Sequence, residues 1–125
     1  MNEVEKMYEN AGVEPKAKCN SGACIVTNPS QTWCKQCESL YYAYPPFTAE
    51  KQLEIYKYLC KPFLITTRYY FDEFSITAEN TFEWRTMTKV SATGKTYEEC
   101  IAKLVNNLWQ DLTEEERKQI KNILK

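Results

Sequence analysis

The chain has 125 residues, of which 43% are hydrophobic and 26% charged, with 3 Gly and 5 Pro. This length and composition predict one packed globular domain and exclude a disordered or low-complexity chain. The net charge is −1, so a general attraction to nucleic acid or anionic lipid is excluded. Histidine is absent, which excludes a Ser/His or Cys/His nucleophile pair, and no other catalytic set is visible. We therefore expect a protein that is not an enzyme.

The N-terminus is acidic and lacks the apolar run of a secretory signal. No apolar stretch approaches the about 20 residues that a spanning helix needs. We expect a cytoplasmic protein with no membrane partner. In that reducing compartment the six cysteines point to metal binding or free thiols before disulfides.

The first predicted element is a short helix over residues 3–10, which Asn2 can cap and Gly12 can end. No period dominates from residue 13 to residue 46, where four of the cysteines lie. Thr48 can cap a second helix, which should end before Pro62.

Three segments rich in β-forming residues follow, at 63–70, 74–77 and 82–90, and the turn of the hairpin is expected at residues 79–81. Alternation places Phe74 and Ile76 on one face of the first hairpin strand, and Phe82 and Trp84 on one face of the second. This pattern predicts an antiparallel sheet with one buried face.

Two more helices complete the chain. Thr96 begins a capping box, and an apolar stripe at helical spacing continues from Tyr97 to Leu112. Thr113 begins a second capping box, which predicts a last helix. The expected fold class is α+β, an antiparallel hairpin sheet packed by helices in residues 48–125, with a cysteine-rich zinc-binding loop region at residues 13–46, all within a single domain over 1–125.

Cys19, Cys24, Cys34 and Cys37 have the spacing C-x4-C-x9-C-x2-C. Four thiolates complete a closed tetrahedral zinc site, and a C-x2-C pair supplies two of them from one turn. Such a zinc ion would be structural, because no position is left for water, and its binding would order a segment that has little core of its own. Free thiols, disulfides and an iron–sulfur cluster are the alternatives.

Gly94-Lys95-Thr96 matches the end of a phosphate-binding loop and lies between a predicted strand and a predicted helix, but Lys89 stands where the motif needs its first glycine. An ordinary capped turn is the favoured interpretation. The alternative is an anion site at the helix start. Lys95 and Thr96, together with Arg68 and Arg85, would then hold the phosphates of a small nucleotide signal.

Aromatic residues are abundant, and Tyr41, Tyr42 and Tyr44 form a run that is typical of a protein-contact surface. Packing around the zinc loop is the alternative for that run. Arginines beside aromatic residues, as in Arg68-Tyr69 and Trp84-Arg85, raise a further hypothesis, the stacking of single-stranded nucleic acid.

The segment YPPFTAEKQLE (44 to 54), the hairpin and the segment YEECIAKLVNNLWQDL (97 to 112) resemble small uncharacterised phage and prophage proteins of Gram-positive bacteria. Residues 48–112 are similar to the phage ABA sandwich domain, a hairpin sheet packed by helices. The resemblance implies a phage accessory protein in the host cytoplasm that binds a host protein, with inhibition of antiviral defence as one such role. Sequestration of a nucleotide signal and nucleic-acid binding are the alternatives, and a homo-oligomer is left open.

Overall fold

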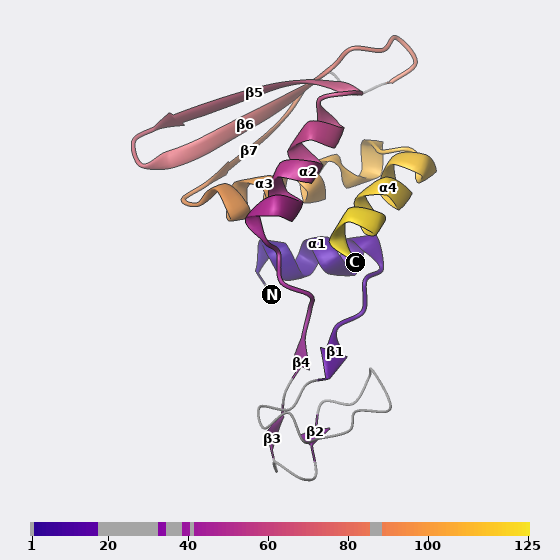
Figure 1. The fold of residues 1–125 in the computed structure, drawn as a ribbon. Coiled ribbons are helices and arrows are strands. Elements are labelled where there is room, and N and C mark those ends of the chain that lie inside the picture. The colour runs from indigo at the N-terminus through magenta and orange to yellow at the C-terminus, as the bar shows by residue number, and fades with distance from the viewer. Residues whose placement is uncertain (1, 18–32, 35–38, 41, 86–88) are drawn as a thin grey trace.

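A computed structural model describes residues 2–17, 33–34, 39–40, 42–85 and 89–125. For the included residues between 16 and 43 it describes backbone pairing alone. Within this part of the chain a three-stranded antiparallel sheet packs against four α-helices, an α+β fold (Figure 1). The elements in chain order are α1 (Glu3–Ala11), β1 (Lys16–Ala17), β2 (Trp33–Cys34), β3 (Ser39–Leu40), β4 (Tyr42–Ala43), α2 (Ala49–Leu59), β5 (Phe63–Tyr70), β6 (Glu73–Asn80), β7 (Lys89–Gly94), α3 (Tyr97–Leu108), the 3-10 helix η1 (Trp109–Asp111) and α4 (Glu114–Leu124).

Helix α3 is the centre of the core. It contacts α1, α2 and strands β6 and β7, so most of its circumference is covered. Its buried residues recur at the helical period, which is why the sequence predicted this helix so clearly. They are Cys100, Ile101, Ala102, Leu104, Val105 and Leu108.

Side-chain caps begin all four helices of the described part. Thr48, Thr96 and Thr113 accept hydrogen bonds from the backbone N–H three residues later, and Asn2 does the same for α1. Only Thr113 forms the full reciprocal capping box, with Glu116. These caps confirm the predicted helix starts.

The sheet has the order β5-β6-β7, and β6 pairs with a neighbour on both sides. Ile76 and Ala78 of β6 and Ala92 of β7 are buried on one face, where β6 and β7 contact α3. The opposite face is polar and largely exposed. The prediction of an antiparallel sheet with one buried face is thus confirmed.

The predicted hairpin turn at residues 79–81 is wrong. The tight turn is Phe71-Asp72, because Tyr70 of β5 pairs with Glu73 of β6. The predicted strand over 82–90 is also wrong for residues 82–85, which lie in a loop, whereas residues 89–90 belong to β7. Local polar contacts explain the second error: the Asn80 side chain binds both the N–H of Phe82 and the carbonyl of Arg85, at 2.9 and 3.1 Å, and holds a loop.

Short strands are present inside the stretch that was expected to be irregular. β1 pairs with β4, with Lys16 opposite Ala43, and β2 pairs with β3, with Cys34 opposite Ser39. In Figure 1 β1 and β4 lie side by side below α1. None of the helices in the described residues is long and apolar enough to cross a membrane.

Candidate functional site

The predicted zinc ligands fall mostly outside the described residues: Cys19, Cys24 and Cys37 are not described, and only the backbone of Cys34 is. Cys34 is the last residue of β2. Four residues separate β2 from β3, and the two strands pair in an antiparallel arrangement. The turn that would carry Cys37 lies outside the described residues. The zinc site stays a prediction. The described part of the chain contains no cluster of three or more Cys, Asp or Glu side chains able to hold a metal ion.

The remaining two cysteines differ from each other. Cys100 is buried, and its thiol donates to the carbonyl of Ala92 at 3.4 Å; burial raises its pKa. Cys60 caps the C-terminus of α2 and is exposed. Neither thiol is therefore activated by its surroundings.

The start of α3 is an ordinary capped turn in its geometry. Thr96 accepts a hydrogen bond from the N–H of Glu99 at 3.1 Å, which occupies one of the donors that an anion would need. Gly94 is explained by packing, since a Cβ there would lie 2.9 Å from the backbone nitrogen of Cys100. Lys95 is exposed, and two carboxylates, Glu98 and Glu99, line the surface beside Thr96.

The two arginines of the nucleotide hypothesis lie in different environments. Arg68 is exposed on the polar face of the sheet, where it lines a shallow hollow of 140 Å³ together with Glu79 and Lys89. The charges there are mixed. Arg85 is buried on another element, so these basic residues do not form one positive surface.

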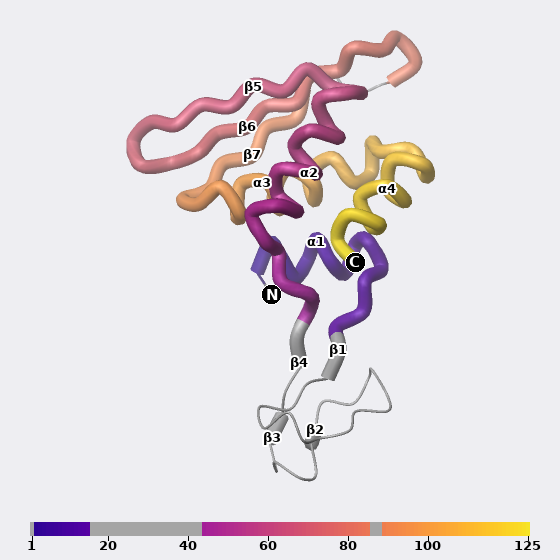
Figure 2. Tube along the Cα trace, in the orientation of Figure 1, coloured from indigo at the N-terminus to yellow at the C-terminus, as the bar shows by residue number. Residues whose placement is uncertain are grey.

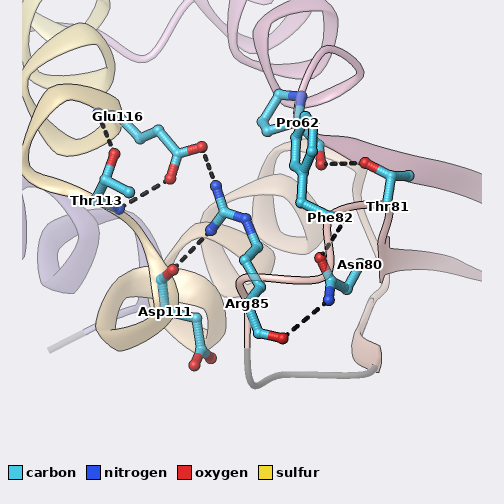
Figure 3. A network of polar contacts seen from close by, with 8 residues as sticks. All are labelled: Pro62, Asn80, Thr81, Phe82, Arg85, Asp111, Thr113 and Glu116. Atoms are coloured by element: carbon cyan, nitrogen blue, oxygen red, sulfur yellow. Dashed lines mark hydrogen bonds and ion pairs between the residues drawn. The ribbon is translucent and has the colours of Figure 1, made fainter.

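Arg85 is held by partners on four sides, as Figure 3 shows for its polar contacts. One guanidinium nitrogen donates to the carbonyl of Asp111 at 2.7 Å, and another forms an ion pair with Glu116. The rings of Phe63 and Trp84 lie 4.5 and 4.4 Å from the guanidinium carbon. Arg85 therefore joins the loop after β6 to α4. Its Nε–H has no partner among the described residues, but the side chain is 2% exposed and so presents no donor to a phosphate at the surface.

The carboxylate of Glu116 is shaped by the same network. Burial is the largest influence and raises its pKa, but hydrogen bonds from Arg85 and from the N–H of Thr113 outweigh it, so its pKa lies below the ordinary value. The N–H of Thr113 donates to this carboxylate at 2.8 Å. The sequence predicted the capping box at Thr113 but not the ion pair between Glu116 and Arg85.

The predicted tyrosine surface is only partly described. Tyr41 is not described, and of Tyr42 only the backbone is, in β4. Tyr44 is half-buried and stacks on Tyr8 with ring centroids 5.1 Å apart. Tyr44 is thus part of the packing between α1 and the segment before α2.

A different aromatic surface stands out at the turn between β5 and β6, which we call the hairpin tip (residues 69–73). Tyr69, Tyr70 and Phe71 are 60%, 62% and 87% exposed. Because β7 ends at Gly94, opposite Phe74, the tip extends beyond the third strand, and Figure 2 shows it reaching past the start of α3. The sequence did not indicate this surface because the turn was expected at residues 79–81; Tyr69 and Tyr70 were predicted as strand residues, and they are in β5.

The backbone of the hairpin tip is strained. Phe71 and Asp72 have φ of 52° and 60°, the left-handed region that two-residue hairpin turns require. Glycine, asparagine and aspartate adopt it most readily, so the strain falls mainly on Phe71, where it costs about 1–2 kcal/mol. The chain thus holds a large aromatic residue in an unfavourable conformation at a position where its side chain is 87% exposed.

The comparisons with known proteins add no relative: no protein family, no curated protein and no solved structure matches this chain.

Proposed function

We propose that this chain is a non-enzymatic binding module that docks onto a protein partner through the hairpin tip. The single observation that carries the proposal is Phe71, an almost fully exposed aromatic side chain on a strained turn. Strain of this kind persists where the surroundings impose it, and it is concentrated at functional sites. Phe and Tyr are also the residues enriched in the buried centres of protein interfaces.

The base of the tip is fixed to the core. The ring of Tyr69 contacts that of Phe74 at 4.7 Å between centroids, and Phe74 in turn contacts Tyr97 at the start of α3, at 6.0 Å. Tyr97 is itself packed near Tyr56 of α2, at 6.4 Å. A rigid support of this kind lowers the entropy that is lost on binding.

The resemblance to small phage proteins makes a host protein the partner to screen first, including components of antiviral defence. A Phe or Tyr anchor needs an apolar pocket, so we propose that the partner surface has one. The nucleotide and single-stranded nucleic-acid alternatives have less support in the described residues, because Arg85 is occupied and Arg68 lies among mixed charges.

The test is capture of a partner from a Gram-positive host lysate, followed by affinity measurement with the purified partner. Phe71→Ala should weaken binding by at least about tenfold, as expected for an interface anchor. Phe82→Ala is the matched control, since Phe82 is an exposed aromatic residue in the loop after β6. Equal binding by both variants, or the failure of any protein to be captured, would overturn the proposal.

A further inference from the structure

Strand β5 forms an open edge of the sheet. It has eight residues, and β6 is the strand that pairs with it in the described part of the chain (Figure 1). An edge strand presents free N–H and C=O groups, and natural proteins usually protect it with charges, prolines or bulges. β5 contains no Pro, its pairing with β6 runs unbroken from Phe63 to Tyr70, and Arg68 is its one charged residue. The edge is therefore weakly protected against pairing with another strand.

The turn of the hairpin determines which backbone groups face this edge. A two-residue turn such as Phe71-Asp72 is closed by a hydrogen-bonded pair, so Tyr70 and Glu73 direct their backbone groups at each other. Because these directions alternate along an antiparallel strand, every second residue of β5 directs its N–H and C=O away from β6. These residues are Phe63, Ile65, Thr67 and Tyr69. Outside the sheet, no described residue forms a hydrogen bond with their backbone.

The opposite edge of the sheet, on β7, is closed by a helix. β7 lies against α3, and the side-chain amide of Asn107 in α3 donates to the carbonyl of Ser91 at 3.1 Å. By the same alternation Ser91 directs this carbonyl away from β6, so Asn107 satisfies an outward group of that edge. At β5 a helix contributes a hydroxyl contact instead, between Tyr56 of α2 and Thr67 at 3.2 Å, which leaves the backbone of the strand free.

The side chains of β5 are arranged in an order that is complementary to itself. Residues 64–65 are aliphatic, residues 66–67 are threonines and residues 69–70 are tyrosines. When a second β5 runs antiparallel to the first, the aliphatic end of each strand therefore meets the aromatic end of the other. Leu64, Tyr69 and Tyr70 are each more than half exposed, so they are available for such contacts.

We propose that two copies of this chain associate through their β5 edges and form one continuous antiparallel sheet. The two-fold axis passes through Thr67, whose outward N–H and C=O pair with those of Thr67 in the second copy. Leu64 then lies opposite Tyr70 of the second copy, and Ile65 lies opposite Tyr69. Aromatic residues opposite aliphatic ones, and threonine opposite threonine, are favourable cross-strand pairs.

Charge favours this register over its neighbours. With the axis at Thr67, Arg68 lies opposite Thr66 of the second copy, so no like charges face each other. An axis at Arg68 would place two guanidinium groups directly opposite, which is destabilising. An axis at Thr66 would place Tyr70 opposite Pro62, which has no N–H, and would lose the aromatic–aliphatic pairs. The inference goes beyond the proposed function, and the two hairpin tips lie at opposite ends of the shared sheet.

Light scattering by the full chain at low salt, from about 1 μM to about 1 mM, tests the proposal over the range expected for a small interface. A reducing agent is present so that the exposed Cys60 cannot link two copies. The average mass should rise with concentration from that of one chain to that of two. A chain that stays monomeric over the whole range would overturn the proposal and leave the edge to a strand of another protein.

Substitutions at Thr66 locate the interface, because Thr66 is exposed and faces Arg68 of the second copy. Thr66→Arg should weaken self-association about fivefold and Thr66→Glu should strengthen it by a similar factor, since the contact with Arg68 occurs twice in each dimer. Thr93→Arg and Thr93→Glu are the matched controls, because Thr93 is exposed on β7 and lies on the same face of the sheet. They should leave the dissociation constant unchanged. Equal shifts at the two positions would overturn the assignment to β5.

Amide hydrogen exchange measured residue by residue gives a second readout that needs no variant. The outward amides of Ile65, Thr67 and Tyr69 should exchange at least about fivefold more slowly in concentrated than in dilute protein. The amides of Thr66 and Arg68, which face β6, should be protected at both concentrations. Dimerisation without slower exchange at the three outward amides would refute the pairing of the β5 edges.

Discussion

Replacing Glu116 with glutamine should lower the free energy of unfolding by about 3 kcal/mol, the lower end of the range for breaking a buried ion pair. Glutamine has nearly the same shape, and its one amide oxygen can keep the bond from the N–H of Thr113. The change therefore removes the charge and the oxygen that accepts from Arg85. Arg85, whose side chain is 2% exposed, would then be buried without a counter-ion. The lower end applies because the Asp111 carbonyl and the two flanking rings remain in place.

Urea unfolding followed by tryptophan fluorescence measures this loss directly, since Trp84 lies against the Arg85 guanidinium. A loss of that size corresponds to a fall in melting temperature of about 10–15 °C for a domain of this length. Glu115→Gln, at the neighbouring exposed position, is the matched control and should change stability by less than about 0.5 kcal/mol. A Glu116→Gln variant no less stable than this control would refute the argument.

The same ion pair predicts how stability depends on pH. The pKa of Glu116 is lowered in the folded chain from its ordinary value of 4.5. Its contribution is therefore fully present above that value and is lost as the pH falls through the lower folded pKa. The stability difference between the unaltered chain and Glu116→Gln should thus shrink on acidification below pH 4.5. A constant difference down to the acid transition would contradict this assignment.

Three further predictions concern other parts of the chain. Gly94→Ala should destabilise the fold by about 1–3 kcal/mol, because the new methyl group would lie 2.9 Å from the Cys100 backbone nitrogen; an unchanged melting temperature would contradict the packing argument. Changing Phe71-Asp72 to Asn-Gly should raise stability in urea by about 1–2 kcal/mol while weakening partner binding, because it relieves the positive φ angles and removes the aromatic anchor; lower stability would show that the turn is not strained. Purified protein should contain equimolar zinc, and Cys34→Ser should lower both zinc content and thermal stability; metal-free protein of unchanged stability would refute the zinc prediction.

The helices were predictable because their signals are local. Thr48, Thr96 and Thr113 each precede a segment with apolar residues at helical spacing, and each caps the helix that the sequence led us to expect. Strand β5 was likewise predictable, since its residues are nearly all β-branched or aromatic. In these elements intrinsic preference and tertiary packing agree.

The turn at Phe71-Asp72 could not be located from sequence because its residues are atypical for that turn. A two-residue hairpin loop is usually recognised by Asn-Gly or Asp-Gly, and here the strands on either side impose the conformation instead. Asn80 offered a conventional turn signal, but it organises a loop through its side chain. The sequence signal and the hairpin turn therefore fall at opposite ends of β6.

The candidate sites depend on contacts between residues that are distant in the chain. Arg85 and Glu116 are 31 positions apart, and the Trp84-Arg85 pair that suggested a nucleic-acid surface is instead a ring over a buried guanidinium. The stacked rings of Tyr8 and Tyr44 likewise join α1 to the segment before α2. Periodicity and composition carry no information on such pairings, which only the folded arrangement provides.

Strands β1 and β4 place Ala17 opposite Tyr42. Opposed Cα atoms in an antiparallel pair are about 5 Å apart, a gap that a short turn can bridge. Ala17 and Tyr42 are thus adjacent in the structure, although they are distant in the sequence. A short designed turn that joins Ala17 to Tyr42 is therefore compatible with the backbone pairing of β1 and β4.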